Sequence, residues 1–174
     1  EEEKQVLPAP PVIVGGALII PAGLLRQLYG VPAPESSLGG ANKRSVELTA
    51  MRTVMEIEVS LGFEPKDVSA ENCGYDIESV IPEDMRETGG PCLRFIEVKG
   101  RAKDAPTITV SKNEILTGLN RPDEYILAIV EVDGAETHAA YLKKPFQAAP
   151  DFGATSVNYD MMNLIRNSEL ILES

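Results

Sequence analysis

Three charged side chains in the middle of the chain combine residue types and spacing that suit metal-dependent chemistry. They are Asp76, Glu97 and Lys99. Side chains alternate between the two faces of a β-strand, so Glu97 and Lys99 point the same way if their segment is a strand. Ile96 and Val98 would then pack into the core behind them. A neighbouring strand that carries Asp76 would complete a group of two carboxylates and one ammonium.

Such a group suits the cleavage of a phosphodiester bond. The phosphate is anionic and repels a hydroxide nucleophile, and one or two hard cations overcome this by holding phosphate oxygens and acidifying a water molecule. Mg²⁺ takes oxygen ligands and keeps several waters, so one or two carboxylates suffice. We expect Asp76, Glu97 and the backbone carbonyl of Val98 to bind Mg²⁺ or Mn²⁺. Lys99 would orient the attacking water or stabilise charge on the phosphoryl oxygens.

The elements that would position these residues follow from periodicity and capping signals. Apolar residues recur at helical spacing over 42–61, and Gly62 follows as a stop signal. Ser111 and Glu114 have the form of a capping box, which predicts a helix to about Leu119. Alternation and β-branched residues predict five strands, at 74–80, 93–99, 107–110, 125–132 and 137–142. This order predicts an α/β fold with a mixed central sheet flanked by helices.

Other segments lack these patterns. Polar segments with proline or glycine are expected to be loops, at 63–72, 82–91 and 100–106. A closing helix is expected over 158–165. Residues 1–40 are interpreted as a linker and N-terminal extension, with a short strand at 12–14 and a strand and helix over 17–29. The core domain would then comprise residues 41–174.

An Asp followed about twenty residues later by Glu-x-Lys is the pattern of the PD-(D/E)xK nuclease superfamily, which this segment resembles. The gap leaves room for one hairpin between neighbouring strands, and the expected order of helices and strands agrees. Tyr75 stands where the superfamily's name has proline. The resemblance implies a restriction-endonuclease-like αβββαβ core with Asp76, Glu97 and Lys99 at its catalytic centre.

Residues 43–142 also carry several short motifs in a defined order: Glu47 with Ala50-Met51, Asp67-Val68-Ser69, Asn72, Gly74-Tyr75-Asp76-Ile77-Glu78-Ser79, Arg94-Phe95-Ile96-Glu97-Val98-Lys99-Gly100-Arg101 and Ser111-x-Asn113-Glu114. In these motifs the sequence is similar to the domain named after the C-terminus of the plant protein NO VEIN. In that family the domain often lies at the tail of Swi/Snf-type helicases, and in other multidomain proteins of bacteria and archaea. The resemblance implies a restriction-endonuclease-like fold within a larger parent protein.

Composition fits a folded domain and limits its partners. Of the 174 residues, 43% are hydrophobic and 25% are charged, and the net charge is −11. Domains that bind nucleic acid through its phosphates are usually basic, so the acidic balance argues against strong DNA binding by this segment alone. A metal site, however, adds carboxylates and brings its own positive charge. The chain does not begin with Met, so we interpret it as a fragment whose parent supplies the basic surface.

Cysteine and histidine usage excludes some kinds of site. Cys73 and Cys92 form no CxxC pair and no Cys/His cluster offers a zinc site, so we expect two reduced thiols in a cytoplasmic protein. The single histidine, His138, leaves little for triad chemistry. The apolar stretch 12–25 is short and broken by glycine and proline, so it is not expected to span a bilayer.

Several further residues have both a functional and a structural interpretation. Glu47, on the helix at 42–61, is either a supporting catalytic carboxylate or an exposed charge that pairs along the helix. Glu58 on the same helix could serve instead. Glu114 is either a capping-box acid or a contact to a nucleic acid. The candidates for nucleic-acid contact are Arg101, Lys103, Asn113 and Glu114.

These observations together predict a Mg²⁺- or Mn²⁺-dependent DNA phosphodiesterase within a helicase-associated or defence-related protein. A homodimer is a possible assembly, because one such site cuts one strand. Two alternatives stay open: a catalytically silent nuclease-fold interaction module, which the acidic charge favours, and a plain structural domain.

Overall fold

The structure, a computed structural model, describes residues 28–29, 39–103 and 105–173. The chain divides into two compact units, Glu1–Gly39 and Gly40–Ser174. The strand expected at 12–14 and the apolar stretch 12–25 lie outside the described residues, as does most of the strand and helix expected over 17–29. No helix within the described ranges is long and apolar enough to cross a membrane.

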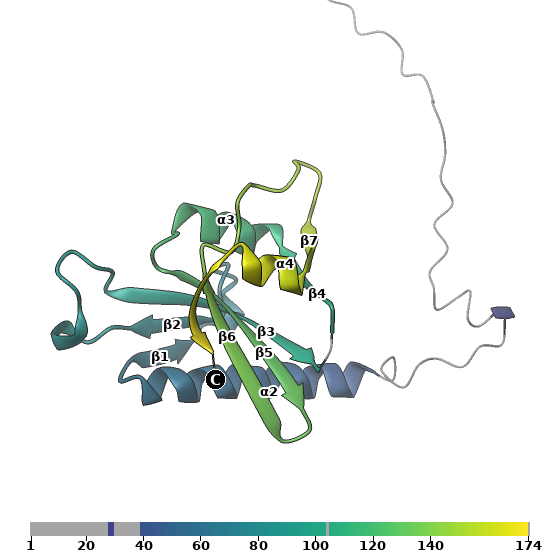
Figure 1. Cartoon of the computed structure of the whole chain (residues 1–174), viewed down its shortest axis with the longest axis horizontal. Coiled ribbons are helices and arrows are strands. Elements are labelled where there is room, and N and C mark those ends of the chain that lie inside the picture. Colours follow the sequence, from purple (N-terminus) through teal and green to yellow (C-terminus); the bar gives the residue numbers. More distant parts are fainter. Residues whose placement is uncertain (1–27, 30–38, 104, 174) are drawn as a thin grey trace, which may run out of the picture. The chain divides into compact units, whose positions relative to one another are not determined.

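A six-stranded mixed sheet forms the centre of the second unit (Figure 1). Its strands, in spatial order, are β1 (Glu64–Asp67), β2 (Ile77–Val80), β3 (Leu93–Ala102), β5 (Tyr125–Asp133), β6 (Glu136–Lys143) and β8 (Glu169–Glu173). Only the β3–β5 pair is parallel within this sheet, and the other neighbours are antiparallel. The expected α/β class with a mixed sheet and flanking helices is confirmed, and the architecture is consistent with a nuclease-like fold.

Helix α2 (Gly39–Ser60) covers one face of this sheet. Its buried Ala50 and Val54 pack in one cluster with Ile96 and Val98 of β3. The close approach requires a glycine in the strand, because a Cβ on Gly100 would lie 2.9 Å from a backbone oxygen of α2 and 3.0 Å from a side-chain carbon. The helix is therefore held against the side of β3 that carries Ile96 and Val98.

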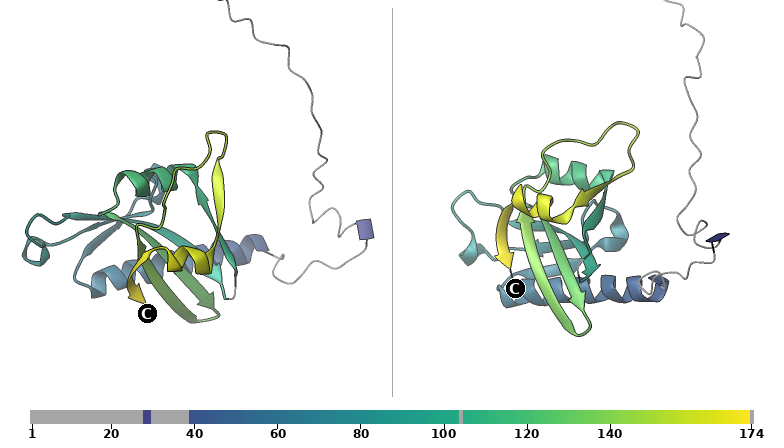
Figure 2. Two further views of the ribbon diagram at one scale, coloured as in Figure 1. Left: turned by 45° about the horizontal axis from the view of Figure 1, so that its top comes forward. Right: turned by 45° about the vertical axis from the view of Figure 1, so that its right-hand side comes forward.

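A second layer covers the opposite face of the sheet (Figure 2). It consists of α3 (Lys112–Asn120), α4 (Met161–Arg166) and a two-stranded sheet of β4 (Thr107–Ser111) and β7 (Ser156–Asp160). Ile115 of α3, Leu164 of α4 and Val110 of β4 pack there against Phe95 and Leu127 of the central sheet. The sheet thus separates two distinct cores.

The capping box expected at α3 is present. Ser111 Oγ accepts a hydrogen bond from the backbone N–H of Glu114, and the Glu114 carboxylate accepts one from the backbone N–H of Ser111. These reciprocal bonds satisfy two backbone donors at the helix start and fix the Glu114 side chain at the edge of the sheet.

The expectation of a loop at 63–72 is wrong. This segment contains β1 and a 3₁₀ helix, η2 (Ser69–Glu71). Strand β1 has no apolar alternation, because it lies at the edge of the sheet, where proline and charged residues are tolerated. A second 3₁₀ helix, η3 (Glu83–Met85), interrupts the expected hairpin loop at 82–91.

Two further expectations are wrong in part, and one strand was not expected. Strand β3 continues through Gly100 to Ala102, into the loop expected at 100–106. The helix expected at 158–165 is instead β7 followed by α4, because Val157 and Tyr159 alternate into the second core and Asp160 caps the helix. Strand β8 was not expected, and its exposed residues pair only with the edge of β6.

A buried ion pair ties α2 to the sheet. Glu58 is 0% exposed, and its Oε1 accepts a hydrogen bond from Arg94 Nη2 at 3.0 Å. Arg94 Nε is also 3.0 Å from Glu58 Oε2, although this second contact lacks hydrogen-bond geometry. The guanidinium lies 4.6 Å from the centre of the Phe63 ring, which adds a cation–π contact. Glu58 is therefore occupied by Arg94 on the α2 side of the sheet.

We predict that Arg94→Ala lowers the free energy of unfolding by about 3–5 kcal/mol, because it leaves the Glu58 carboxylate buried without its partner. Urea unfolding followed by circular dichroism measures the loss. Lys43→Ala is the matched control, since Lys43 pairs with Glu47 at 3.8 Å on the surface and its loss should cost less than about 1 kcal/mol. Equal effects of the two substitutions would contradict a stabilising role for the buried pair.

Candidate active site

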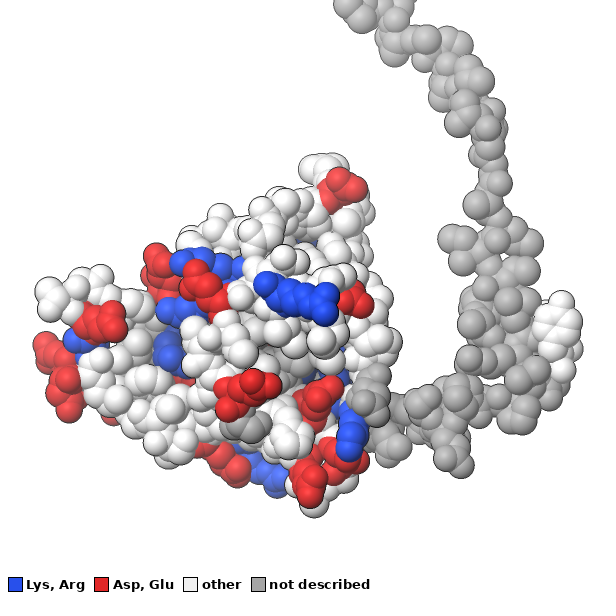
Figure 3. Space-filling view, viewed as in Figure 1, with Lys and Arg blue, Asp and Glu red and all other residues white. Residues whose placement is uncertain are grey.

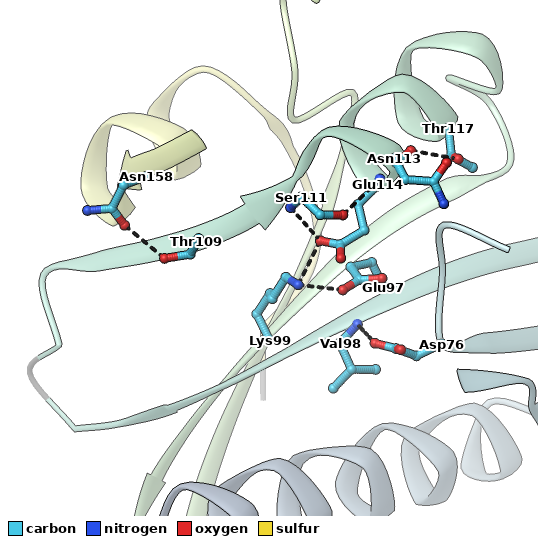
Figure 4. Close-up of polar contacts among 10 residues, drawn as sticks. All are labelled: Asp76, Glu97, Val98, Lys99, Thr109, Ser111, Asn113, Glu114, Thr117 and Asn158. Atoms are coloured by element: carbon cyan, nitrogen blue, oxygen red, sulfur yellow. Dashed lines mark hydrogen bonds and ion pairs between the residues drawn. The ribbon is translucent and has the colours of Figure 1, made fainter. Parts of the chain in front are cut away.

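Strand β3 presents Glu97 and Lys99 on the face opposite α2, as the two-residue period of a strand predicts (Figure 4). Ile96 and Val98 belong to the core beneath α2, whereas Phe95 belongs to the core beneath α3. Glu97 is only 4% exposed. Its carboxyl group therefore has little water around it and depends on protein neighbours for stabilisation.

The Lys99 ammonium bridges two carboxylates from different elements. Its Nζ lies 2.6 Å from Glu97 Oε1 on the same strand and 2.7 Å from Glu114 Oε2 at the start of α3. The same Glu114 oxygen accepts the capping hydrogen bond from Ser111 at 3.1 Å. Glu114 is thus both the capping-box acid and a partner of Lys99, a link that the sequence analysis did not make.

The strand expected at 74–80 begins only at Ile77, so Asp76 joins the group from the turn before β2 and not from the strand itself. Its Oδ2 accepts a hydrogen bond from the backbone N–H of Val98 at 3.0 Å, and its own N–H donates to the carbonyl of Ile96 at 2.9 Å. The carboxylate is thereby anchored to β3 beside Glu97 and Lys99 (Figure 4). The β2–β3 pairing thus brings Asp76, which is distant in sequence, to Glu97 and Lys99.

The turn that carries Asp76 is clamped against α3. Gly74 has φ +89°, a conformation that favours glycine, and a Cβ there would overlap Thr117 Oγ1. Two residues before Gly74, the backbone carbonyl of Asn72 accepts a hydrogen bond from the Asn113 side chain of α3 at 3.3 Å. These contacts fix the distance between α3 and the turn, and therefore between Glu114 and Asp76.

Burial and neighbouring charges raise the pKa values of both central carboxyl groups, Glu97 and Asp76. Burial is the largest cause that raises the pKa of Glu97 to about 9; the negative charges of Asp76 and Glu114 act in the same direction, and Lys99 opposes the shift. Burial also raises the pKa of Asp76 above its ordinary value, although the Val98 N–H and Lys99 act against it. Both groups therefore resist ionisation in the metal-free protein.

The pKa values of Lys99 and Glu114 are shifted in the directions that favour their charged forms. Burial alone would lower the pKa of Lys99, but the charges and hydrogen bonds of Glu97 and Glu114 outweigh it, and the pKa lies above its ordinary value. Burial would raise the pKa of Glu114, but hydrogen bonds from Lys99 and Ser111 outweigh it, and the pKa lies below its ordinary value. Lys99 is consequently a protonated donor rather than a base.

The site has the oxygen donors that a cation needs, but its carboxylates are not arranged around a position for a metal ion. If Asp76, Glu97 and Glu114 are all ionised, three negative charges face the single positive charge of Lys99. No group of three or more His, Cys, Asp or Glu side chains in the described ranges is arranged to hold a metal ion. Lys99 itself lies between Glu97 and Glu114. A Mg²⁺ ion needs only one or two carboxylates, however, so the donors present fit a hard cation.

Glu47 is not brought to this group. It lies on α2, which covers the opposite face of the sheet, and it is exposed and pairs with Lys43 at 3.8 Å. Glu58 is buried on that same face with Arg94. The structure therefore gathers Asp76, Glu97, Lys99 and Glu114 without a carboxylate from α2.

The residues expected to contact nucleic acid differ in whether their side chains already bind other groups of the protein. Arg101, further along β3, is partly buried, and its Nε has no hydrogen-bond partner among the described residues. Lys103 pairs with Asp133 at 2.7 Å. Asn113 is exposed but donates to Asn72. Of these, Arg101 is the group whose donors are least used within the described chain.

We predict that Gly74→Ala destabilises the protein more than Gly89→Ala does. Both glycines have positive φ, and a Cβ on Gly89 meets nothing within 4 Å, so both variants incur a backbone cost of about 1–2 kcal/mol. Gly74→Ala adds about 1–3 kcal/mol for the collision with Thr117. Urea unfolding of the two variants gives the difference; equal losses would show that the turn is not clamped.

We also predict that the metal-free protein loses stability as pH rises from about 5 to about 9. The folded-state pKa of Glu97 is about 9, against an ordinary value of 4.5. Between these values the folded state retains a proton that the unfolded state has released, so the free energy of unfolding falls with pH. Glu97→Gln cannot titrate, so its unfolding free energy should fall less steeply. Urea unfolding of both proteins with a chelator at pH 5, 7 and 9 tests this; parallel profiles would contradict it.

Comparison with known families agrees with the narrower resemblance in the sequence. The family model described as "Protein NO VEIN, C-terminal" matches residues 46–142, more than half of the chain. The match runs from α2 through most of β6 and includes Asp76, Glu97, Lys99 and Glu114. Comparisons with curated proteins and with solved structures give no match. The chain belongs to the NO VEIN C-terminal family.

Proposed function

We propose that this domain is a Mg²⁺- or Mn²⁺-dependent phosphodiesterase of the PD-(D/E)xK type that acts on DNA. The observation that carries the proposal is the convergence of Asp76, Glu97 and Lys99 at the β2–β3 pairing, with Glu114 of α3 as a second partner of the lysine. The spacing of Asp and Glu-x-Lys and the order of elements agree with that superfamily. An excess of negative charge in a largely buried site supports the binding of a cation.

Asp76, Glu97 and the carbonyl oxygen of Val98 would hold the metal. Two carboxylates and one carbonyl suit Mg²⁺, which keeps several of its waters. When bound, the ion would hold phosphate oxygens and lower the pKa of a water molecule. The hydrogen bond from the Val98 N–H holds the Asp76 carboxylate in place before any ligand arrives. Binding of the cation would also displace the proton that Glu97 retains.

Lys99 would act through its charge. The protonated amine donates hydrogen bonds, so it suits the orientation of the attacking water and the stabilisation of charge on the phosphoryl oxygens. Its raised pKa argues against a role as general base. Glu114, fixed by the capping box, would keep the ammonium protonated and directed into the site after Glu97 turns to the metal.

DNA binding by this domain alone is expected to be weak. The net charge is −11, and on the face in Figure 3 acidic and basic side chains are interspersed. Arg101 is the best-placed phosphate contact on the strand of Glu97 and Lys99, whereas Lys103 and Asn113 would exchange an internal partner for DNA. A larger parent protein with a helicase-like motor, or a second copy of the domain, would supply the remaining affinity. Free Cys73 and Cys92 agree with a reducing, cytoplasmic location.

A catalytically silent interaction module is the second candidate. The acidic surface and the position of Lys99 between two carboxylates favour it, since the ion pairs satisfy the site in part without a metal. The two candidates differ in their response to Mn²⁺. A nuclease should bind Mn²⁺ through Asp76 and Glu97, and a silent module should not.

We predict that Asp76→Asn and Lys99→Ala each lower DNA cleavage by at least about 100-fold, while the domain stays folded. Removal of one stabilising donor or ligand typically has an effect of this size. The assay measures cleavage of single- and double-stranded DNA in Mn²⁺, with circular dichroism as the check on folding. Asp123→Asn and Lys66→Ala, both on exposed residues, are the matched controls.

Cleavage that persists in Asp76→Asn or Lys99→Ala would refute the site assignment. Calorimetric titration with Mn²⁺ separates the remaining outcomes. Mn²⁺ binding to the wild type and not to Asp76→Asn supports the metal site, and the absence of binding to both proteins supports the silent module.

A further inference from the structure

Tyr125, at the start of β5, lies beneath the acidic group. It pairs in register with Phe95 of β3, so its side chain is on the same face of the sheet as Glu97. The ring is 0% exposed and packs under α3, where a Cβ on Gly118 would lie 3.0 Å from a ring carbon of Tyr125. Gly118 is one helical turn beyond Glu114, so the two residues lie on the same side of α3.

The Tyr125 hydroxyl has no hydrogen-bond partner within the described part of the chain. Its residue lies on the strand next to β3, on the face that carries Glu97 and two positions before the register partner of Glu97. Burial raises the pKa of Tyr125 well above its ordinary value, and the charges of Glu97, Glu114 and Asp76 raise it further, in that order. The other fully buried tyrosine, Tyr141, lies on the α2 side and donates to the carbonyl of Val54 at 3.4 Å.

A buried hydroxyl without a partner is unfavourable, so such groups are normally satisfied by protein or by water. The two neighbouring glutamates have oxygens to share. Lys99 takes Oε1 of Glu97, and Lys99 and Ser111 both take Oε2 of Glu114. Oε2 of Glu97 has no partner among the described residues, and although the Ser111 side chain also hydrogen-bonds the Glu114 carboxylate, each carboxylate oxygen can accept more than one hydrogen bond.

We propose that Tyr125, Glu97 and Glu114 bind one water molecule, and that Tyr125 thereby acts as a positioning residue for the Glu97 carboxylate. The hydroxyl donates to the water, and the water forms one further hydrogen bond with each glutamate. Three hydrogen bonds are the usual number for a buried water. The arrangement satisfies the phenol and restricts rotation of Glu97.

The consequence for metal binding rests on the proposed function, whereas the presence of the water does not. Groups that orient a metal ligand typically contribute 10- to 100-fold to metal affinity or activity. Loss of the Tyr125 hydroxyl should therefore weaken metal binding through Glu97, even though the phenol is not itself a ligand.

The first test is a high-resolution crystal structure of the metal-free wild-type protein. The inference requires a water within hydrogen-bond distance of Tyr125 Oη and of the two glutamates. An empty space at that position, or a direct bond from Tyr125 to a carboxylate, would overturn it. This test needs no variant, so it holds even if substitutions at this buried position impair folding.

The second test compares Tyr125→Phe with Tyr141→Phe. Each removes one buried hydroxyl, but Tyr141 is on the opposite face of the sheet. Calorimetry with Mn²⁺ should show at least about 10-fold weaker binding for Tyr125→Phe and unchanged binding for Tyr141→Phe. Equal affinities of Tyr125→Phe and the wild type would overturn the positioning role. A wild type that binds no Mn²⁺ would refute the metal site itself, and the crystal structure would still decide whether the water is present.

Discussion

The arrangement around β3 depends on an imbalance of charge. Asp76, Glu97 and Glu114 face one ammonium, that of Lys99, in a space where Glu97 is only 4% exposed. Burial is the largest cause of the raised pKa values of Glu97 and Asp76, and the neighbouring carboxylates add to it, so the three carboxyl groups cannot all ionise without a compensating cation. The capping box of α3 and the clamped turn at Gly74 hold the groups in place despite their mutual repulsion. The cost of this arrangement is what a divalent cation would relieve.

The two faces of the same strand show the contrast between a structural and a functional ion pair. Arg94 faces α2 and forms a one-to-one pair with the buried Glu58, flanked by the Phe63 ring. Lys99 faces α3 and is shared between two carboxylates, with a third nearby. The first pair balances its own charge and fastens a helix to the sheet. The second places more carboxyl groups than cations next to the unpartnered hydroxyl of Tyr125.

Local signals in the sequence were sufficient for the parts of the fold that local chemistry determines. The alternation of β3, the helix of α2 and the capping box at Ser111 and Glu114 are all patterns within a few residues. The bridge from Lys99 to Glu114 and the buried phenol of Tyr125 were not foreseen, because they depend on how α3 lies on the sheet. Strands β1, β7 and β8 were also missed. They are short edge or ribbon strands whose residues are largely exposed, so they carry little hydrophobic pattern.

The match to the NO VEIN C-terminal family spans the residues that form the site, and the grouping of three carboxyl side chains around one ammonium supplies a physical reason to expect a cation there. In the metal-free protein the raised pKa values of Glu97 and Asp76 limit the negative charge of the site, and a bound cation would allow both groups to ionise. The most direct measurement is a crystal structure of the protein soaked in Mn²⁺, with anomalous scattering used to locate the metal. Our account predicts a peak bound by Asp76, Glu97 and the Val98 carbonyl, with Lys99 displaced toward Glu114. A fully soaked crystal with no peak there, and with Lys99 still bridging Glu97 and Glu114, would contradict it.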